Sequence, residues 1–537
     1  MSDVARLRSA RALRLAHDRW LFECAYPPSR QAWARADAGL RALARRVREL
    51  GDAGRARALF NSGIAGSTVG SAFSLAITRW LLERFPGDVR LLSVGADKPQ
   101  AMALLGTALD PLEREALGEH PLAWARWQRQ HLGEDSSRRL ERLLQLALAL
   151  PSDAALREAA FVAQRVFVEW RIGPDAPSLT LGRWALCPLR PQPDGPRPPG
   201  DLADAWGRVR PRERALDDAG RAALVDLARG VMASLLRETD FFSFANVGET
   251  RLFDLGRGLQ AALFACAPAH KLALECYVGY LLIRNRIPVA YGGAWVLGRQ
   301  ARFGVNVLPP FRGGESQAMV AALLRLYAWR FRVRRIVVDP YQIGHGNPDG
   351  IASGAFWFYH RLGFRPQEPA LGALADAWLA RRRRTGERTP AAVLRTLSAS
   401  TLAWDSPGSG RRGTVDIRAL GAAVSGHVLA RFDGDRDAAR RAALARLAAA
   451  DPRAGDARRP GANALARLAV LFAAIEPRRG WSAGEVAALV DLADAKDVDE
   501  ERFARLVAAH AGLMRALDRA GTPREAGRAG TPREAGR

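Results

Sequence analysis

The segment 307–314, Val-Leu-Pro-Pro-Phe-Arg-Gly-Gly, has residue types that suit the binding of a phosphate group. Its pattern predicts the end of a β-strand, a glycine-containing turn and the start of a helix. In such a turn, free backbone N–H groups and the positive end of a helix dipole point at one spot. Glycines let the backbone approach the anion closely, and Arg312 adds a positive charge. The segment therefore predicts a site for a phosphorylated ligand.

A second segment, 358–364, has the sequence Phe-Tyr-His-Arg-Leu-Gly-Phe and predicts an aromatic helix followed by a new strand. Gly363 stands where a helix commonly ends, because glycine adopts positive φ without strain. The spacing of apolar residues before this segment predicts three strands, a helix and a buried strand, at 280–284, 288–297, 302–308, 317–331 and 335–339. The order β-β-β-α-β-α-β predicts a mixed sheet with helices on its faces.

The two segments resemble the motifs of the GNAT superfamily of N-acyltransferases. The family signature V-x-P-x-[YF]-R-G is matched by Val307, Pro309, Phe311, Arg312 and Gly313. The later signature A-x-x-F-Y-x-x-x-G-F is matched by Ala355, Phe358, Tyr359, Gly363 and Phe364. Both occur in the family's order, and the resemblance covers about 130 residues, 241–369.

The resemblance implies acetyl-CoA or another acyl-CoA as co-substrate, and transfer of the acyl group to an amine on a small molecule or protein. In the family, the loop after the strand wraps the CoA pyrophosphate, and the matching positions here are Val307, Arg312, Gly313, Gly314, Ser316 and Gln317. The strands 302–308 and 335–339 are expected to separate so that pantetheine can bind between them.

Two kinds of catalytic group follow from the resemblance. Tyr359 falls where many members carry the tyrosine that protonates the departing thiolate, and a phenol can do this because its pKa lies above that of a thiol. The family does not fix the general base. His345, in a glycine-rich loop, and Glu275, before the first strand, are candidates; other titratable residues nearby are Glu249, Asp254 and His270.

The sequence departs from the family where small residues are usual, because Glu315 and Gln317 occupy those positions. A carboxylate beside a pyrophosphate costs about 1–4 kcal/mol of Coulomb energy, unless the neighbouring glycines turn Glu315 outward. Two alternatives to the acyltransferase therefore stay open. One is a catalytically inactive GNAT-like scaffold that binds CoA or a partner. The other is a nucleic-acid-binding protein, suggested by the net charge of +24.

The positive charge is almost entirely arginine, since Lys98, Lys271 and Lys496 are the only lysines. The arginines are spread along the chain apart from the run 381–384, which favours a solvated basic surface over a nucleic-acid site. The four cysteines have neither CxxC pairs nor zinc-like spacing, so we expect reduced thiols and no metal site. Without an apolar leader or a run of about 18 apolar residues, we expect a bacterial cytoplasmic protein that does not bind membranes.

The expected fold class is α+β, with a GNAT-like mixed sheet embedded between largely helical regions. The expected organisation is a helical domain at 1–187, a proline-rich linker at 188–200, a helical connection at 201–240, the GNAT-like domain at 241–369, a helical C-terminal region at 370–519 and a disordered tail with a nine-residue tandem repeat at 520–537.

Overall fold

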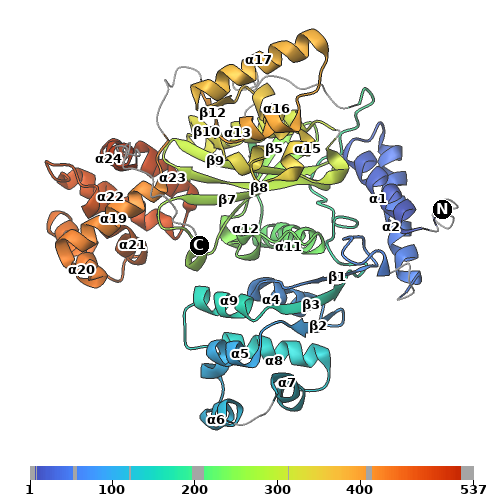
Figure 1. Ribbon diagram of the computed structural model, residues 1–537, viewed down its shortest axis with the longest axis horizontal. Coiled ribbons are helices and arrows are strands. Elements are labelled where there is room, and N and C mark those ends of the chain that lie inside the picture. The colour runs from blue at the N-terminus through green and yellow to red at the C-terminus, as the bar shows by residue number, and fades with distance from the viewer. Residues whose placement is uncertain are drawn as a thin grey trace, which may run out of the picture.

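The computed structural model describes residues 7, 9–51, 57–119, 123–195, 211–312, 314–406 and 414–521. Gly313, the end of the expected linker (196–200) and nearly all of the expected disordered tail (522–537) lie outside the described residues. The described chain is a mixed α+β protein (Figure 1), so the α+β class predicted from the sequence is confirmed.

A nine-stranded sheet lies at the centre of the molecule (Figure 1). Its strand order is β11-β12-β10-β9-β8-β7-β6-β5-β4. Neighbouring strands are antiparallel except for β9 and β10, which are parallel. The strands are β4 (Arg212–Arg214), β5 (Arg251–Gly256), β6 (Leu259–Ala265), β7 (Cys276–Arg284), β8 (Ile287–Leu297), β9 (Gln300–Val307), β10 (Arg335–Val338), β11 (Arg365–Pro366) and β12 (Leu402–Asp405).

The elements predicted between residues 280 and 364 are present, with small changes at their ends. The turn between β7 and β8 contains Asn285 and Arg286, both with positive φ (47° and 75°), as a tight hairpin requires. The long helix α13 (Ser316–Phe331) joins β9 to β10. The aromatic helix α16 (Ala355–Arg361) leads to β11 and follows two short helices, α14 (Pro340–Ile343) and α15 (Pro348–Ser353).

Helices cover both faces of the sheet (Figure 1). On one face lie α13, α16 and α17 (Pro369–Thr385), and on the other lie α11 (Asp218–Ser234) and α12 (Asp240–Ser243). The ring of Phe241 in α12 lies directly on β7, where a Cβ added to Gly279 would be 2.0 Å from it. Glycine is therefore required at this position for the helix to approach the sheet.

The regions expected to be helical throughout also contain strands. β4 is the end strand on one side of the central sheet, and β12 lies between β10 and β11 on the other side. In the N-terminal region, β1 (Thr68–Ser71), β2 (Val89–Val94) and β3 (Val166–Arg171) form a separate sheet in the order β1-β3-β2. These strands have three to six residues, which is too short for a period-two pattern to stand out among helices rich in alanine and arginine.

The remaining helices form three groups around the central sheet (Figure 1). The hairpin of α1 (Ala10–Ala25) and α2 (Arg30–Glu49) packs beside it. The small N-terminal sheet is accompanied by α4 (Leu75–Arg84), α5 (Lys98–Leu105), α6 (Pro111–Glu119), α7 (Trp124–Leu132), α8 (Ser136–Leu148) and α9 (Ala154–Ala163). After α18 (Ala391–Leu397), the C-terminal group contains α19 (Ile417–Phe432), α20 (Arg436–Ala450), α21 (Ala462–Ala474), α22 (Ala483–Lys496), α23 (Glu500–Ala509) and α24 (Ala511–Gly521).

Among the described residues, no helix combines the length and the apolar character that crossing a bilayer would need.

Candidate functional site

The parallel pair β9 and β10 is joined over a short stretch only. The paired residues are Gln300–Arg302 with Arg335–Val337. The rest of β9, 303–307, stays paired with β8 but runs past the last residue of this register with β10. Gln342 of α14 approaches β9 there, with its Nε2 atom 3.1 Å from where a Cβ on Gly304 would stand. The two strands that are expected to separate for pantetheine are thus adjacent and paired at one end.

The loop between β9 and α13 is built differently from a glycine-rich turn. Residues Pro309–Phe311 form a single turn of 3-10 helix, η5. Arg312, which is exposed, donates a hydrogen bond from its Nε atom to the carbonyl of Val307 at 3.3 Å. Its guanidinium group is therefore held beside the end of β9, where it can attract an anion from solvent.

Glu315 points into the protein, so the outward turn that the neighbouring glycines could give it is not adopted. Its side chain is 3% exposed and lies 2.8 Å from Nη2 of Arg284, which is 1% exposed. Nη2 of Arg257 is 3.1 Å from the same carboxylate. The Arg284 contact is an ion pair without aligned hydrogen-bond geometry, since its Nη2 has no hydrogen-bond partner among the described residues. The carboxylate is thus neutralised inside the fold.

Tyr26, at the end of α1, contacts the start of α13, although it does not belong to the central sheet. Its hydroxyl accepts a hydrogen bond from the backbone N–H of Glu315 at 3.2 Å, and its ring lies 4.9 Å from the Arg284 guanidinium carbon. The hairpin of α1 and α2 is fixed in this position because Asn285 donates to the carbonyl of Ala25 at 2.8 Å. Nothing in the sequence pattern indicates that Tyr26 reaches this loop, because the contact spans 289 residues.

Ser316 and Gln317, which the resemblance places in the cofactor site, differ in their surroundings. Gln317 is buried and donates to the carbonyl of Phe358 at 3.2 Å, which ties α13 to α16. The Ser316 hydroxyl is buried and has no hydrogen-bond partner among the described residues. Gln317 is therefore a link between helices, and Ser316 has an unused polar group at the first turn of α13.

Tyr359 is held inside the sheet–helix interface. It is 2% exposed, its ring packs edge-on against Phe364, and its hydroxyl has no hydrogen-bond partner among the described residues. Burial raises the pKa of Tyr359 well above its usual value. It lies close enough to Tyr280 to influence the pKa of that residue. Tyr280 in turn donates to the carbonyl of Gly304 on β9 at 2.8 Å. Tyr359 is thus a buried, protonated phenol near Tyr280, and it is Tyr280 that contacts β9.

The two candidate bases lie in different environments. His345 is exposed in the turn after α14. Glu275 is 13% exposed and lies 3.7 Å from Arg302, while Asp339, directly after β10, lies 3.9 Å from the same arginine. Burial raises the pKa of Glu275, and Arg302 opposes this rise. Among the described residues, no hydrogen bond or ion pair joins either candidate to Tyr359. Of the two candidates, Glu275 is the one that lies beside the β9–β10 pair, through its contact with Arg302 of β9.

The other titratable residues near the block have structural partners. Asp254 pairs with Arg214 at 2.8 Å, and the His270 ring stacks on Phe244 at 3.8 Å. Glu249 accepts a hydrogen bond from Lys271 at 2.6 Å.

Glu249 belongs to a buried network of four charges that sequence reasoning missed. Lys271 lies 2.6 Å from Glu249 and 3.4 Å from Glu500, and Lys496 lies 2.6 Å from Glu500. All four side chains are at most 7% exposed. The signal was present, since two of only three lysines in an arginine-rich chain meet here. Because every charge has a partner of opposite sign, the network holds α22 and α23 on the sheet.

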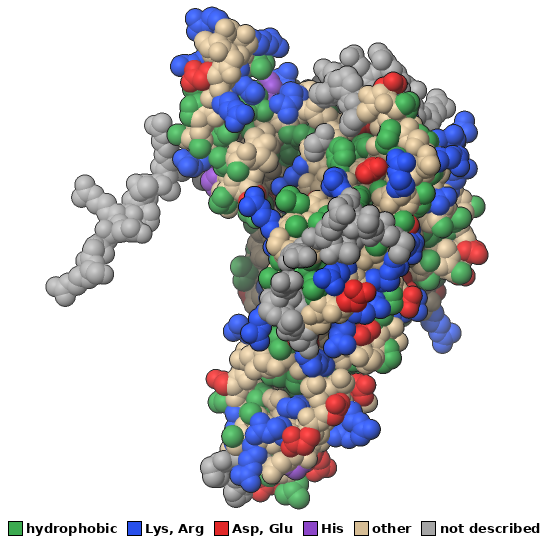
Figure 2. Space-filling model, turned by 90° about the vertical axis from the view of Figure 1, so that its right-hand side faces the viewer, with side chains coloured by type: hydrophobic (Ala, Val, Ile, Leu, Met, Phe, Trp, Pro, Cys, Tyr) green, Lys and Arg blue, Asp and Glu red, His purple; other side chains and the backbone are tan. Residues whose placement is uncertain are grey.

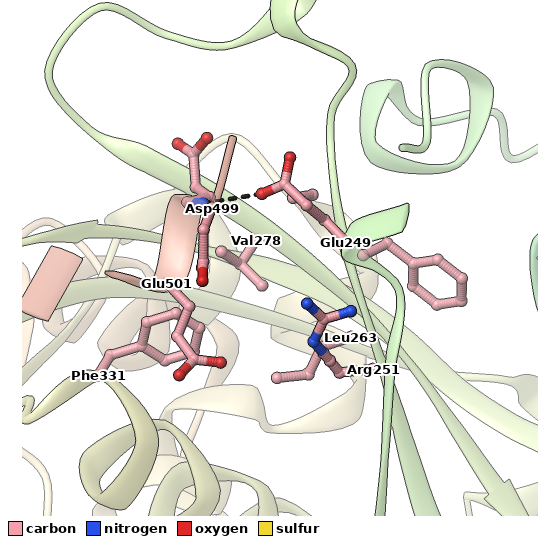
Figure 3. A pocket seen from close by; sticks show the side chains of 10 residues that line it. Glu249, Arg251, Leu263, Val278, Phe331, Asp499 and Glu501 are labelled. Carbon is pink, nitrogen blue, oxygen red and sulfur yellow. Dashed lines mark hydrogen bonds between the residues drawn. The ribbon is translucent and has the colours of Figure 1, made fainter. Parts of the chain in front are cut away.

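A small pocket opens beside this network (Figure 3). Glu249 and Arg251 face Asp499 and Glu501 across it, and the dashed line marks the hydrogen bond from the N–H of Glu500 to Glu249, 2.7 Å long. Glu501 is paired with Arg330 at 2.6 Å. The carboxylates of the pocket are thus largely engaged in holding α23.

Comparisons of the chain with protein-family models, with curated proteins and with solved structures found no match.

Proposed function

We propose that the chain is an acyl-CoA-dependent N-acyltransferase of the GNAT type, which transfers an acetyl or other acyl group to an amine. The observation that carries the proposal is the parallel pair β9 and β10, which is joined only at Gln300–Arg302. The helix α13 follows β9, and Tyr359 is buried nearby. The helix N-terminus and Arg312 suit the phosphates of acyl-CoA. The four cysteines are free and buried, which suits the reducing cytoplasm.

The chemistry assigns a role to each group. A backbone N–H in the open part of β9 polarises the thioester carbonyl. The amine nitrogen attacks the carbonyl carbon and gives up a proton to Glu275, whose raised pKa makes it a better base than an ordinary carboxylate. The carbon–sulfur bond then breaks, and the departing thiolate takes its proton from Tyr359. Burial keeps the phenol of Tyr359 protonated, and it also raises the proton affinity of a thiolate formed in the same site, so that the proton can pass between them.

The first test is calorimetric titration of the full chain with acetyl-CoA, with ATP as a control polyanion. Saturable one-site binding of acetyl-CoA, but not of ATP, supports the cofactor site. A screen of amines for acyl-CoA-dependent release of free thiol then tests turnover. Equal and salt-sensitive binding of both ligands would mean that the arginines collect phosphates without a specific site.

The Tyr359→Phe variant tests the assigned acid. We expect the thiol-release rate to fall by about 10²-fold or more, with acetyl-CoA binding unchanged. The matched control is Tyr341→Phe, since Tyr341 is 61% exposed on α14 and has no assigned role. Full activity in Tyr359→Phe would remove this residue from the mechanism.

A second function, a scaffold that binds CoA or a partner without turnover, is favoured by one specific observation. Tyr26 and Glu315 occupy the space around the start of α13, and a Cβ added to Gly314 would be 2.3 Å from the Tyr26 ring. Binding of acetyl-CoA without thiol release for any amine would support this scaffold over the enzyme.

A further inference from the structure

A concentration of arginines lies on the outer part of α16, on β11 and on α17, and continues into the segment that follows. Eight arginines and three carboxylates occur between residues 361 and 395. α17 lies on the outer side of α16 (Figure 1), and Figure 2 shows Lys and Arg side chains gathered over this uppermost part of the molecule. The arginine run at 381–384, which the whole-chain composition left without a role, is thus part of a larger basic surface.

Three of these arginines lie around one buried histidine, and a fourth lies near one of the three. Arg365, Arg361 and Arg383 all lie near enough to His360 to lower its pKa, and Asp376 opposes them. Arg365 donates to the His360 carbonyl at 3.0 Å, and Arg382 lies near enough to Arg361 to lower its pKa. We call Arg361, Arg365, Arg382 and Arg383 the His360 arginine cluster.

The cluster has few negative neighbours among the described residues, Asp376 being the one that acts on His360. None of its four guanidinium groups forms a salt bridge with a described residue, whereas the neighbouring Arg381 pairs with Glu387 at 2.8 Å. Like charges held together cost free energy unless an anion shares the surface. Arg382 is oriented by the Trp357 ring, 5.1 Å from its guanidinium carbon, so less side-chain entropy is lost when it meets a ligand.

The occupant is defined by the shape of this surface. The arginines come from two helices and a strand and continue along the end of α17, which is more extended than one phosphate needs. A lipid-binding helix would expose large apolar side chains beside its charges, but between residues 355 and 400, all of which are described, no large apolar side chain is exposed. We propose that the His360 arginine cluster binds the phosphate backbone of a nucleic acid, which reverses the expectation drawn from the whole-chain charge. This proposal stands independently of acyl transfer.

The test is binding of fluorescently labelled 25-nucleotide RNA, single-stranded and duplex, followed by anisotropy over a range of KCl concentrations. The variant Arg361→Gln/Arg365→Gln/Arg383→Gln removes three exposed charges of the cluster. The matched control, Arg126→Gln/Arg129→Gln/Arg142→Gln, removes three exposed arginines on α7 and α8 that form no salt bridge with described residues. Because Arg365 also supports the backbone, the pair Arg361→Gln/Arg383→Gln serves as a second variant.

We expect the cluster variant to bind RNA at least about tenfold more weakly, and its slope of log K against log salt to be smaller by about two, since each lost phosphate contact removes about 0.7–0.9. The control should stay within about twofold of the unchanged chain. Equal weakening in both sets would overturn the proposal, because the charge would then act without a site. Loss of acetyl-CoA binding with unchanged RNA binding would also overturn it, and would assign the cluster to the phosphates of CoA.

Discussion

The buried pair of Arg284 and Glu315 gives a prediction whose magnitude follows from the structure. Both side chains are at most 3% exposed and 2.8 Å apart. Removing one partner of such a pair leaves a buried charge, which typically costs about 3–5 kcal/mol. Arg257 still reaches Glu315 at 3.1 Å but is 41% exposed, so we expect Arg284→Met to cost about 3 kcal/mol. Glu315→Gln leaves Arg284 buried beside the Tyr26 ring and should cost a similar amount.

The double variant Arg284→Met/Glu315→Gln removes both charges and should be more stable than either single variant. The measurement is urea unfolding followed by tryptophan fluorescence and far-UV circular dichroism for all four proteins. A favourable coupling energy above about 2 kcal/mol is expected for residues in direct contact. If the two costs simply add, the pair is not neutralised in the way the geometry indicates.

The same four proteins test the proposal that the β9–α13 loop binds the phosphates of acyl-CoA. The double variant removes no net charge, so its affinity for acetyl-CoA should stay within about threefold of the unchanged chain. A tenfold gain in the double variant would show that Glu315 repels the phosphates despite Arg284 and Arg257. The inward position assigned to the carboxylate would then be wrong for the bound protein.

Three further predictions concern stability. Lys496→Met should lower the free energy of unfolding by about 3–5 kcal/mol, because it removes the partner that lies 2.6 Å from the buried carboxylate of Glu500. Lys98→Met, at a half-buried position, is the control. Equal losses of unfolding free energy in both variants would contradict the importance of the network. His360 is 4% exposed, and its pKa is lowered to about 4, by burial first and then by Arg365. The stability that the neutral His360 contributes is therefore complete above the unfolded pKa of about 6.5 and is lost as pH falls towards 4, by up to about 3 kcal/mol. Between pH 7.5 and pH 5, His360→Asn should lose less unfolding free energy in urea than the unchanged chain. An equal loss in both proteins would refute this assignment. Gly279→Ala should lower the free energy of unfolding by at least about 1–3 kcal/mol, because its Cβ would meet the Phe241 ring at 2.0 Å. The control is Gly426→Ala, which has open space around it in α19 and should be neutral or stabilising. Urea unfolding measures both variants.

The sequence predicted the elements whose signals are local. The hairpin turn at 284–286, the apolar face of α13 and the glycine after α16 are each readable within a few residues, and all are present. β6 was missed because it is buried on both faces, so its sequence lacks the alternation that identifies a strand. Its partner β5 has no regular alternation either. β4 and β12 have too few residues for any period to be visible.

The surroundings of the candidate site could not be predicted in the same way. Glu315 was recognised as a departure from the family pattern, but its partner Arg284 is 31 residues away and Tyr26 is 289 residues away. Whether a carboxylate points to solvent or into an ion pair depends on these long-range contacts, which leave no spacing signal. The lysine network is different, since the scarcity of lysine marks both of its cations in the sequence itself.

The hairpin of α1 and α2 and the C-terminal helices share one hydrophobic core with the central sheet, whereas the small N-terminal sheet and the helices beside it have a core of their own. One continuous cluster of buried side chains includes Leu21 of α1, Tyr280 of β7 and Leu489 of α22. Asn285 in the β7–β8 turn bonds to the backbone of Ala25, and Lys496 bonds to the carbonyl of Glu275. A fragment limited to 241–369 would expose that cluster and leave Lys271 with Glu249 but without Glu500. The proposed base, Glu275, is itself held from the C-terminal side, so the flanking helices position the candidate chemistry as directly as the sheet does.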